Sequence, residues 1–268
     1  MTATAQFSQP TDGVGLILID NGPRNFGTTE LGLRIIDALQ TAADAACRVV
    51  VIASDRPGYF IAHWSLQGII DTQRAGPPAV SHRPRQPRVF DFIEASPMIV
   101  IAANNGQAWG GGAELSWGCD LRIAAESATY GQPEVALGII PGAGGTTRLS
   151  RLIGPTKCME MILDGRPITA REALALGAIN KVVPDERLRE ESIAWAAHIA
   201  RWPAWSLAAC KHSLIDGRDI ALDAARRSES AIFQSVARRE DSIQLMAAAQ
   251  ARYDAGADSF EAIGIPRA

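Results

Sequence analysis

Short apolar runs recur through the first two thirds of the chain and alternate with segments of helical spacing. GVGLILID (13–20) and RVVVIAS (48–54) have the length and the β-branched content of buried strands. Between them, TTELGLRIIDALQTAADA (28–45) repeats its apolar residues with the period of an amphipathic helix. PMIVIAA (97–103) and DLRIAA (120–125) repeat the strand pattern. Strands and helices in such alternation indicate an α/β fold.

The pattern changes after about residue 185. DERLREESIAWAAHIARWP and the segment from Arg218 to Gly256 have helical spacing, and no strand pattern follows them. We therefore expect an α/β body over 1–185 and a helical region over 186–268. Apolar residues on more than one side of these helices fit a role in oligomerisation. Packing of these helices inside the same chain is an equal alternative.

Composition and charge are those of an ordinary globular protein. Apolar residues make up 47% of the chain and charged residues 21%, and the net charge of −3 gives no indication of nucleic-acid binding. The four cysteines form no CxxC pair, which argues against a zinc site or a disulfide framework. The N-terminus lacks a signal-peptide pattern, and no apolar run reaches the ~18 residues of a membrane span. We expect a cytoplasmic protein without a nucleic-acid or membrane partner. AGPPAVSHRPRQPR (75–88) predicts a mobile surface loop because prolines interrupt regular structure.

Three consecutive glycines, Gly110–Gly112, lead into an apparent helix in WGGGAEL (109–115). A glycine-rich turn at a helix start exposes unpaired N–H groups, which suit a developing negative charge. The alternative is that the glycines only permit close packing. A dinucleotide fingerprint is disfavoured because Leu115 occupies the third glycine position, and the later loop PGAGGTTRL (141–149) lacks the GK[ST] of a phosphate-binding loop.

Two glutamates stand among apolar neighbours. Glu114 follows the glycine run, and Glu134 lies in QPEVALG. Buried carboxylates need partners or a raised pKa, and such environments are used for general acid–base catalysis. The alternative is that both are exposed or paired with arginine.

Four stretches together resemble the enoyl-CoA hydratase/isomerase family, also called the crotonase superfamily. They are PRNF (23–26), GYFIAHWSL (58–66), NNGQAWGGGAELSWGCDLRIAAESATYGQPEVALGIIPGAGGTTRLSRLIG (104–154) and LDGRPITAREALALGAINKVVP (163–184). The resemblance implies a spiral of ββα units with a C-terminal helical region. It also implies an acyl-CoA thioester as substrate, no cofactor or metal apart from the CoA of that substrate, and a homotrimer or a dimer of trimers.

The resemblance implies a role for several backbone and side-chain groups. The N–H groups of Trp64 and Gly111 would form an oxyanion hole for the thioester carbonyl. Glu114 and Glu134 would hold one water between them, with Glu114 the expected base and Glu134 the expected proton donor. The N–H of Gly142 would help to hold that water.

Other positions are implied to contact the substrate. The carbonyl of Ala62 would meet the adenine of CoA, and Arg24 would lie near its phosphates. Trp109, together with Trp64, would narrow or flatten the acyl pocket, which suits a short, planar or aromatic acyl group.

The segment FIAHWS (60–65) departs from the family pattern F-x-A-G-x-D. His63 replaces the glycine and Ser65 replaces the aspartate. If the backbone at His63 needed a positive φ, the residue would be strained. The imidazole would also lie at the acyl pocket, either as an additional acid or base or simply as a packing group.

Both glutamates of a hydratase are present, so we expect hydration of a 2-enoyl thioester to a 3-hydroxyacyl thioester. Two alternatives remain open. One is another crotonase reaction, such as double-bond isomerisation, hydrolysis or a lyase reaction. The other is a non-catalytic binding module in which the altered loop blocks the thioester.

Overall fold

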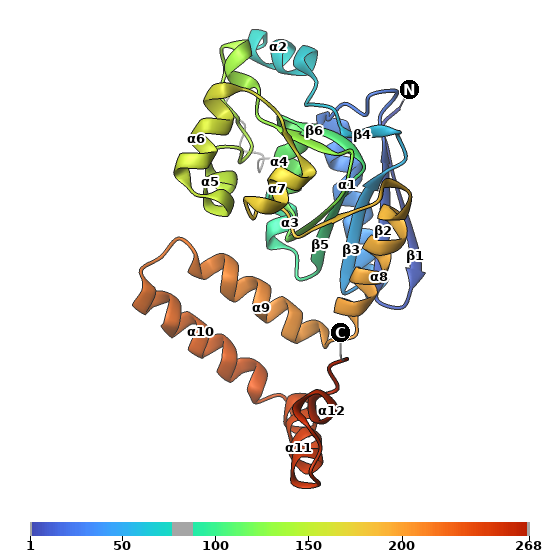
Figure 1. The fold of residues 1–268 in the computed structure, drawn as a ribbon, viewed down its shortest axis with the longest axis vertical. Coiled ribbons are helices and arrows are strands. Elements are labelled where there is room, and N and C mark those ends of the chain that lie inside the picture. Colours follow the sequence, from blue (N-terminus) through green and yellow to red (C-terminus); the bar gives the residue numbers. More distant parts are fainter. Residues whose placement is uncertain (1, 77–87, 267–268) are drawn as a thin grey trace. The chain divides into compact units, whose positions relative to one another are not determined.

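The computed structural model of the chain describes residues 2–76 and 88–266 (Figure 1). It divides into two compact units, Met1–Ala204 and Trp205–Ala268. The proline-rich segment expected to form a loop falls largely on residues 77–87, outside the described residues. Within the described ranges, no helix is both long enough and apolar enough to cross a bilayer.

The first unit contains a six-stranded sheet of order β1-β2-β3-β5-β7-β10. All neighbouring pairs are parallel except β1 with β2, which is antiparallel. The strands are β1 Thr4–Thr11, β2 Val14–Asp20, β3 Val49–Ser54, β5 Ile99–Asn104, β7 Leu121–Ala125 and β10 Lys181–Val183. β3 is buried along its whole length, as expected for a central parallel strand. The four strands expected from apolar runs are confirmed, while the edge strand β1, which contains Pro10, was not anticipated.

A second sheet has four strands in the order β4-β6-β8-β9. They are β4 Gly58–Ile61, β6 Gly106–Trp109, β8 Thr129–Gly131 and β9 Ile168–Thr169. The chain alternates between the sheets, since β3 leads to β4, β5 to β6 and β7 to β8, and each pair is followed by helical structure. This repetition confirms the expected spiral of ββα units.

Helices surround the two sheets (Figure 1). They are α1 Thr29–Asp44, α2 Leu66–Arg74, α3 Val89–Ala95, α4 Gly111–Gly118, α5 Thr147–Ile153, α6 Pro155–Asp164, α7 Ala170–Ala175 and α8 Leu188–Ala200, with 3-10 turns at Glu134–Leu137 and Asp185–Arg187. α1 begins where the Thr28 hydroxyl accepts the Leu31 N–H at 3.1 Å and so forms an N-cap. α8 packs on β2, β3 and β5. It therefore belongs to the first unit, which extends to Ala204 rather than ending at residue 185.

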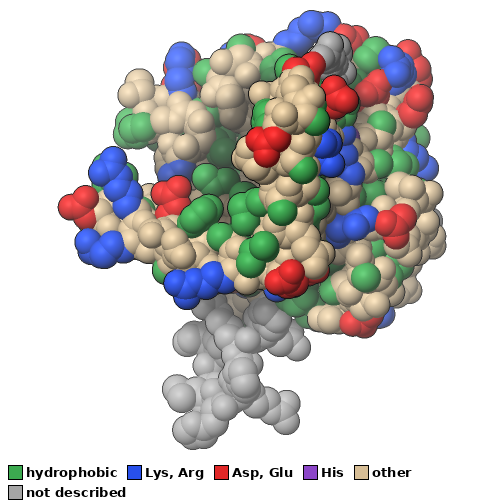
Figure 2. Space-filling view, turned by 90° about the horizontal axis from the view of Figure 1, so that it is seen from below, with side chains coloured by type: hydrophobic (Ala, Val, Ile, Leu, Met, Phe, Trp, Pro, Cys, Tyr) green, Lys and Arg blue, Asp and Glu red, His purple; other side chains and the backbone are tan. Residues whose placement is uncertain are grey.

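The second unit is helical, as expected. Its helices are α9 Ala204–Gly217, α10 Leu222–Ala237, α11 Glu240–Asp254 and α12 Ser259–Ile263. Trp205 donates from Nε1 to Ser242 Oγ at 3.1 Å, and the Arg239 guanidinium lies 4.6 Å from the centre of its ring. Large apolar side chains remain exposed, among them Leu214 at 75% and Phe233 at 58%. Figure 2, which views the molecule from below, shows hydrophobic side chains exposed among charged ones.

Candidate active site

The glycine run joins β6 to α4, and each of its glycines has a separate steric reason. Gly110 has φ 50°, and a Cβ there would lie 2.9 Å from Glu134 Oε1. A Cβ on Gly111 would lie 2.8 Å from Trp64 Cβ, and one on Gly112 would lie 2.1 Å from the Ile61 carbonyl oxygen. Close packing is therefore a confirmed reason for this run. The N–H of Gly111, the first residue of α4, also has no carbonyl one turn earlier in the helix to receive it.

Glu114 lies in the first turn of α4 and is 3% exposed. Its Oε1 accepts two backbone N–H groups, from Ala143 at 2.6 Å and from Gly145 at 2.8 Å. Burial raises the pKa of this carboxyl above its usual value, while the two N–H groups oppose the shift. Both bonds go to one oxygen, which leaves Oε2 for another partner.

Glu134 begins the 3-10 turn after Pro133 and is 8% exposed. Burial raises its pKa to about 7, and the charge of Glu114 acts in the same direction. The Gln132 amide, oriented with its nitrogen toward Glu134, lies 3.2 Å and 3.1 Å from the two carboxylate oxygens. In that orientation its oxygen accepts the Trp117 indole N–H at 3.0 Å. Glu134 therefore takes up a proton near neutral pH, at a position held by a fixed amide.

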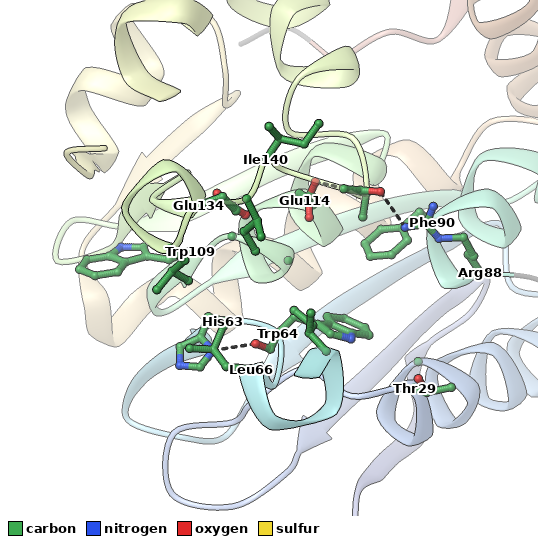
Figure 3. Close-up of a pocket in the computed structure, with 18 of the residues that line it drawn as sticks. Thr29, His63, Trp64, Leu66, Arg88, Phe90, Trp109, Glu114, Glu134 and Ile140 are labelled. Carbon is green, nitrogen blue, oxygen red and sulfur yellow. Dashed lines mark hydrogen bonds between the residues drawn. The ribbon is translucent and has the colours of Figure 1, made fainter. Parts of the chain in front are cut away.

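Both carboxylates line one cavity of about 930 Å³. Neither glutamate forms an ion pair with arginine among the described residues, so the alternative of exposed or arginine-paired carboxylates is wrong. Figure 3 shows Glu114 and Glu134 on one side of the cavity, facing the loop that carries His63 and Trp64. Most other lining side chains are apolar and come from α1, α2, α3 and the segment after Glu134. This is the arrangement of a substrate cavity with a few convergent polar groups.

The loop at 60–65, which departs from the family pattern, contains no residue with a positive φ. Among the described non-glycine residues only Asn25 and Ala46 have positive φ, so His63 needs no left-handed conformation. Gly27 N–H donates to the His63 carbonyl at 2.9 Å, and Ser65 N–H donates to the Gly27 carbonyl at 2.8 Å. These bonds lie on either side of Trp64 and leave its N–H without an acceptor among the described residues.

The side chains of this loop are held by local contacts. The Ser65 hydroxyl accepts the Gly68 N–H at 3.2 Å and caps α2. His63 Nδ1 lies 2.8 Å from the Trp64 carbonyl oxygen and therefore carries the proton, since a carbonyl only accepts. The His63 ring also packs on Phe26 at a centroid distance of 4.6 Å. Both substitutions are thus accommodated without closing the cavity.

Two further predicted positions line the cavity. Trp109 lies beside Glu134 in Figure 3, with its indole N–H donating to Thr129 Oγ1 at 3.1 Å. Gly142 also lines the cavity, and its carbonyl accepts the Arg88 guanidinium at 3.1 Å. The amides that hold Glu114 belong to the neighbouring Ala143 and Gly145, which the sequence analysis did not single out.

Arg24 and Ala62 do not line the cavity. Ala62 is 1% exposed, and its carbonyl accepts the Gln107 side-chain amide at 3.0 Å. Arg24 is exposed, and its carbonyl accepts the Ala62 N–H at 3.3 Å. The CoA contacts expected for these two residues stay predictions. In the described parts of the chain, no group of three or more His, Cys, Asp or Glu side chains is placed to hold a metal ion.

Comparisons with known proteins agree with this fold. The family model described as enoyl-CoA hydratase/isomerase matches residues 9–253. The chain is 32% identical over 228 residues to the 2,3-dehydroadipyl-CoA hydratase of Escherichia coli, covering 84% of this chain and 88% of that protein. It is 43% identical over 146 residues to a crotonyl-CoA hydratase of Syntrophomonas wolfei, covering 54% of this chain and 56% of that protein.

Solved structures show the same relationship. The crystal structure of an enoyl-CoA hydratase from Bacillus anthracis superposes with a TM-score of 0.78 at 32% identity, covering 93% of this chain and 96% of the other. A probable enoyl-CoA hydratase/isomerase from Mycobacterium abscessus gives a TM-score of 0.79 at 28% identity, covering 95% and 96%. The chain therefore belongs to the enoyl-CoA hydratase/isomerase family of enzymes.

Proposed function

We propose that the protein hydrates a trans-2-enoyl-CoA thioester to the 3-hydroxyacyl-CoA thioester. The observation that carries this proposal is the pair of buried glutamates facing one cavity from different elements. Burial raises the pKa of both carboxyls, but two backbone amides oppose the shift at Glu114, whereas the pKa of Glu134 is raised to about 7. Neighbouring carboxyls in such different environments suit a base and an acid, respectively.

In the proposed reaction, one water lies between the two carboxyl groups. The water oxygen forms a bond to Cβ as its proton passes to the Glu114 carboxylate. The electron pair of the double bond moves toward the thioester, and the enolate oxygen is stabilised by the N–H groups of Trp64 and Gly111. Glu134 then gives its proton to Cα. The two N–H donors would each contribute roughly 3–4 kcal/mol of transition-state stabilisation.

Crotonyl-CoA tests this proposal. We expect loss of the conjugated thioester absorbance with formation of 3-hydroxybutyryl-CoA. Glu134→Gln keeps the shape but removes the donated proton, so turnover should fall by about 10³-fold or more while the variant stays folded. Leu174→Met, an exposed substitution on α7, serves as a control.

Other outcomes point to the alternatives. Movement of the double bond without uptake of water would indicate an isomerase, and release of free CoA would indicate a hydrolase. CoA binding without turnover of any acyl group would favour a non-catalytic module. Full activity of Glu134→Gln would contradict the assignment of the proton donor.

We also propose that the chain assembles as a homotrimer or a dimer of trimers. The support is the set of apolar side chains exposed on the second unit, such as Leu222 and Phe233. Light scattering that gave the mass of a single chain would contradict this proposal.

The names of the relatives point to more than one acyl group. One names 2,3-dehydroadipyl-CoA, whose acyl chain ends in a carboxylate, and another names crotonyl-CoA, whose chain does not. The acyl group accepted by this protein must therefore be inferred from its own cavity.

A further inference from the structure

A positively charged side chain, Arg88, reaches the cavity that contains the two glutamates. It lies directly before α3, and its Nη2 donates to the Gly142 carbonyl at 3.1 Å. Its guanidinium carbon lies 5.4 Å from the centre of the Phe90 ring. These two contacts hold the guanidinium at the cavity wall, although the residue is otherwise exposed.

Arg88 forms no ion pair with an acidic side chain in the described parts of the chain, although its charge acts on Glu114 and lowers the pKa of that carboxyl. The preceding segment 77–87 contains no aspartate or glutamate in its sequence. The nearby Arg148 differs, because its Nη2 lies 2.6 Å from Glu94 and 3.7 Å from Asp91. Arg148 is therefore held in ion pairs by the fold, whereas Arg88 brings to the cavity a positive charge that no ion pair among the described residues neutralises.

The position of Arg88 along the cavity follows from its contacts. Gly142 accepts from Arg88, and the next residue, Ala143, donates to Glu114. Figure 3 shows the side chains of Glu134, Glu114 and Arg88 in that order across the view of the cavity. In the proposed hydration, Glu134 serves Cα and Glu114 serves Cβ. The part of the acyl chain beyond Cβ therefore extends toward Arg88 and Phe90.

We propose that Arg88 binds a carboxylate at the far end of the acyl chain, so that the preferred substrates are enoyl-CoA thioesters of dicarboxylic acids. The guanidinium is planar and matches a carboxylate with two parallel hydrogen bonds. Without such a cation, a second carboxylate beside Glu114 would meet like-charge repulsion. The direction in which the acyl chain lies in the cavity rests on the proposed hydration. Binding is therefore measured separately from turnover.

Adipyl-CoA and hexanoyl-CoA are suitable probes because they have the same acyl length, differ in the terminal carboxylate and carry no double bond to hydrate. Their affinities for the full-length protein are measured by titration calorimetry. We expect adipyl-CoA to bind about tenfold more tightly, the size expected for one charge-assisted pair at a partly exposed site. Arg88→Gln should bring the ratio of the two affinities close to one, and Arg88→Lys should keep part of the preference.

Arg171→Gln is the matched control, because this arginine on α7 is 75% exposed, pairs with Glu126 and lies outside the cavity. It should leave the ratio as in the natural chain. Equal binding of the two thioesters by the natural chain would overturn the proposal. The proposal would also be overturned if Arg88→Gln lowered the affinities for both thioesters by the same factor, since Arg88 would then act only through Glu114. Absence of turnover on enoyl-CoA substrates would defeat the proposed hydration instead, and the affinity ratio would still decide the role of Arg88.

Discussion

The two segments that supply the proposed oxyanion donors reach similar positions by different means. Each ends a strand of the second sheet and leads into a helix, since β4 precedes α2 and β6 precedes α4. The segment at 109–112 contains three glycines, one with φ 50°. The segment at 60–65 contains none, and neither His63 nor Trp64 has a positive φ.

The difference lies in what surrounds each helix. Every residue of α4 is buried, and its first turn approaches the Ile61 carbonyl and the Trp64 side chain. α2 has no buried residue. A backbone N–H can be presented by any residue whose peptide is correctly oriented. Glycine is needed only where the backbone takes a positive φ, as at Gly110, or where a neighbouring segment comes too close for a Cβ.

Among changes to the two donor segments, the largest effect should come from adding one methyl group to the glycine run. Gly111→Ala would place a Cβ 2.8 Å from Trp64 Cβ, which forces the two proposed donors apart. We expect the turnover of an enoyl-CoA substrate to fall by about 10²–10³-fold, comparable to the loss of one oxyanion donor. Steady-state kinetics and circular dichroism would separate this loss from unfolding.

Gly118→Ala is the control on the same helix. Its Cβ would meet Phe90 Cβ at 3.7 Å, an ordinary contact. The variant should retain most of its activity. Equal activity of the two alanine variants would show that the separation between α4 and the Trp64 loop does not matter for catalysis.

Glu134, whose Oε1 lies beside Gly110 of the glycine run, makes stability depend on pH because its carboxyl is buried. The pKa of Glu134 rises from 4.5 to about 7 on folding, so the folded state binds its proton more tightly than the unfolded chain. The stabilising contribution of this proton is present at low pH and is lost as the pH rises from about 4.5 through about 7. At about 1.4 kcal/mol per pH unit, the free energy of unfolding should fall by about 3 kcal/mol from this group.

Urea unfolding of the natural chain and of Glu134→Gln across this pH range measures the contribution. The variant lacks the titrating group, so it should gain stability relative to the natural chain as the pH rises. Parallel curves for the two proteins would show that Glu134 has an ordinary pKa. That result would weaken the case for Glu134 as the proton donor.

The smallest effect is expected in the loop without glycine. Ser65→Ala removes the hydroxyl that accepts the Gly68 N–H and should lower the free energy of unfolding by about 1 kcal/mol. Ser65→Asp should keep the cap and the stability, because aspartate is an equally good N-cap residue. Thermal unfolding compares the two. If Ser65→Asp lost as much stability as Ser65→Ala, the loss would not come from the missing cap.

The sequence by itself determined the elements whose signals are local. Four strands of the larger sheet and α1 follow from the apolar pattern, because this pattern depends on residues close together in the chain. The motif that contains Glu114 and Glu134, together with three other stretches, indicated the family that the comparisons confirm. Their burial was an expectation from apolar neighbours, and it agrees with the structure.

Only the tertiary structure decided how the site is held and where the first unit ends. The amides of Ala143 and Gly145 bond Glu114, and they lie 29 and 31 residues further along the chain. Whether Arg88 or Arg148 is neutralised depends likewise on which acidic side chains packing brings near. These relations arise from contacts between distant segments, and local sequence patterns carry no information about such distances.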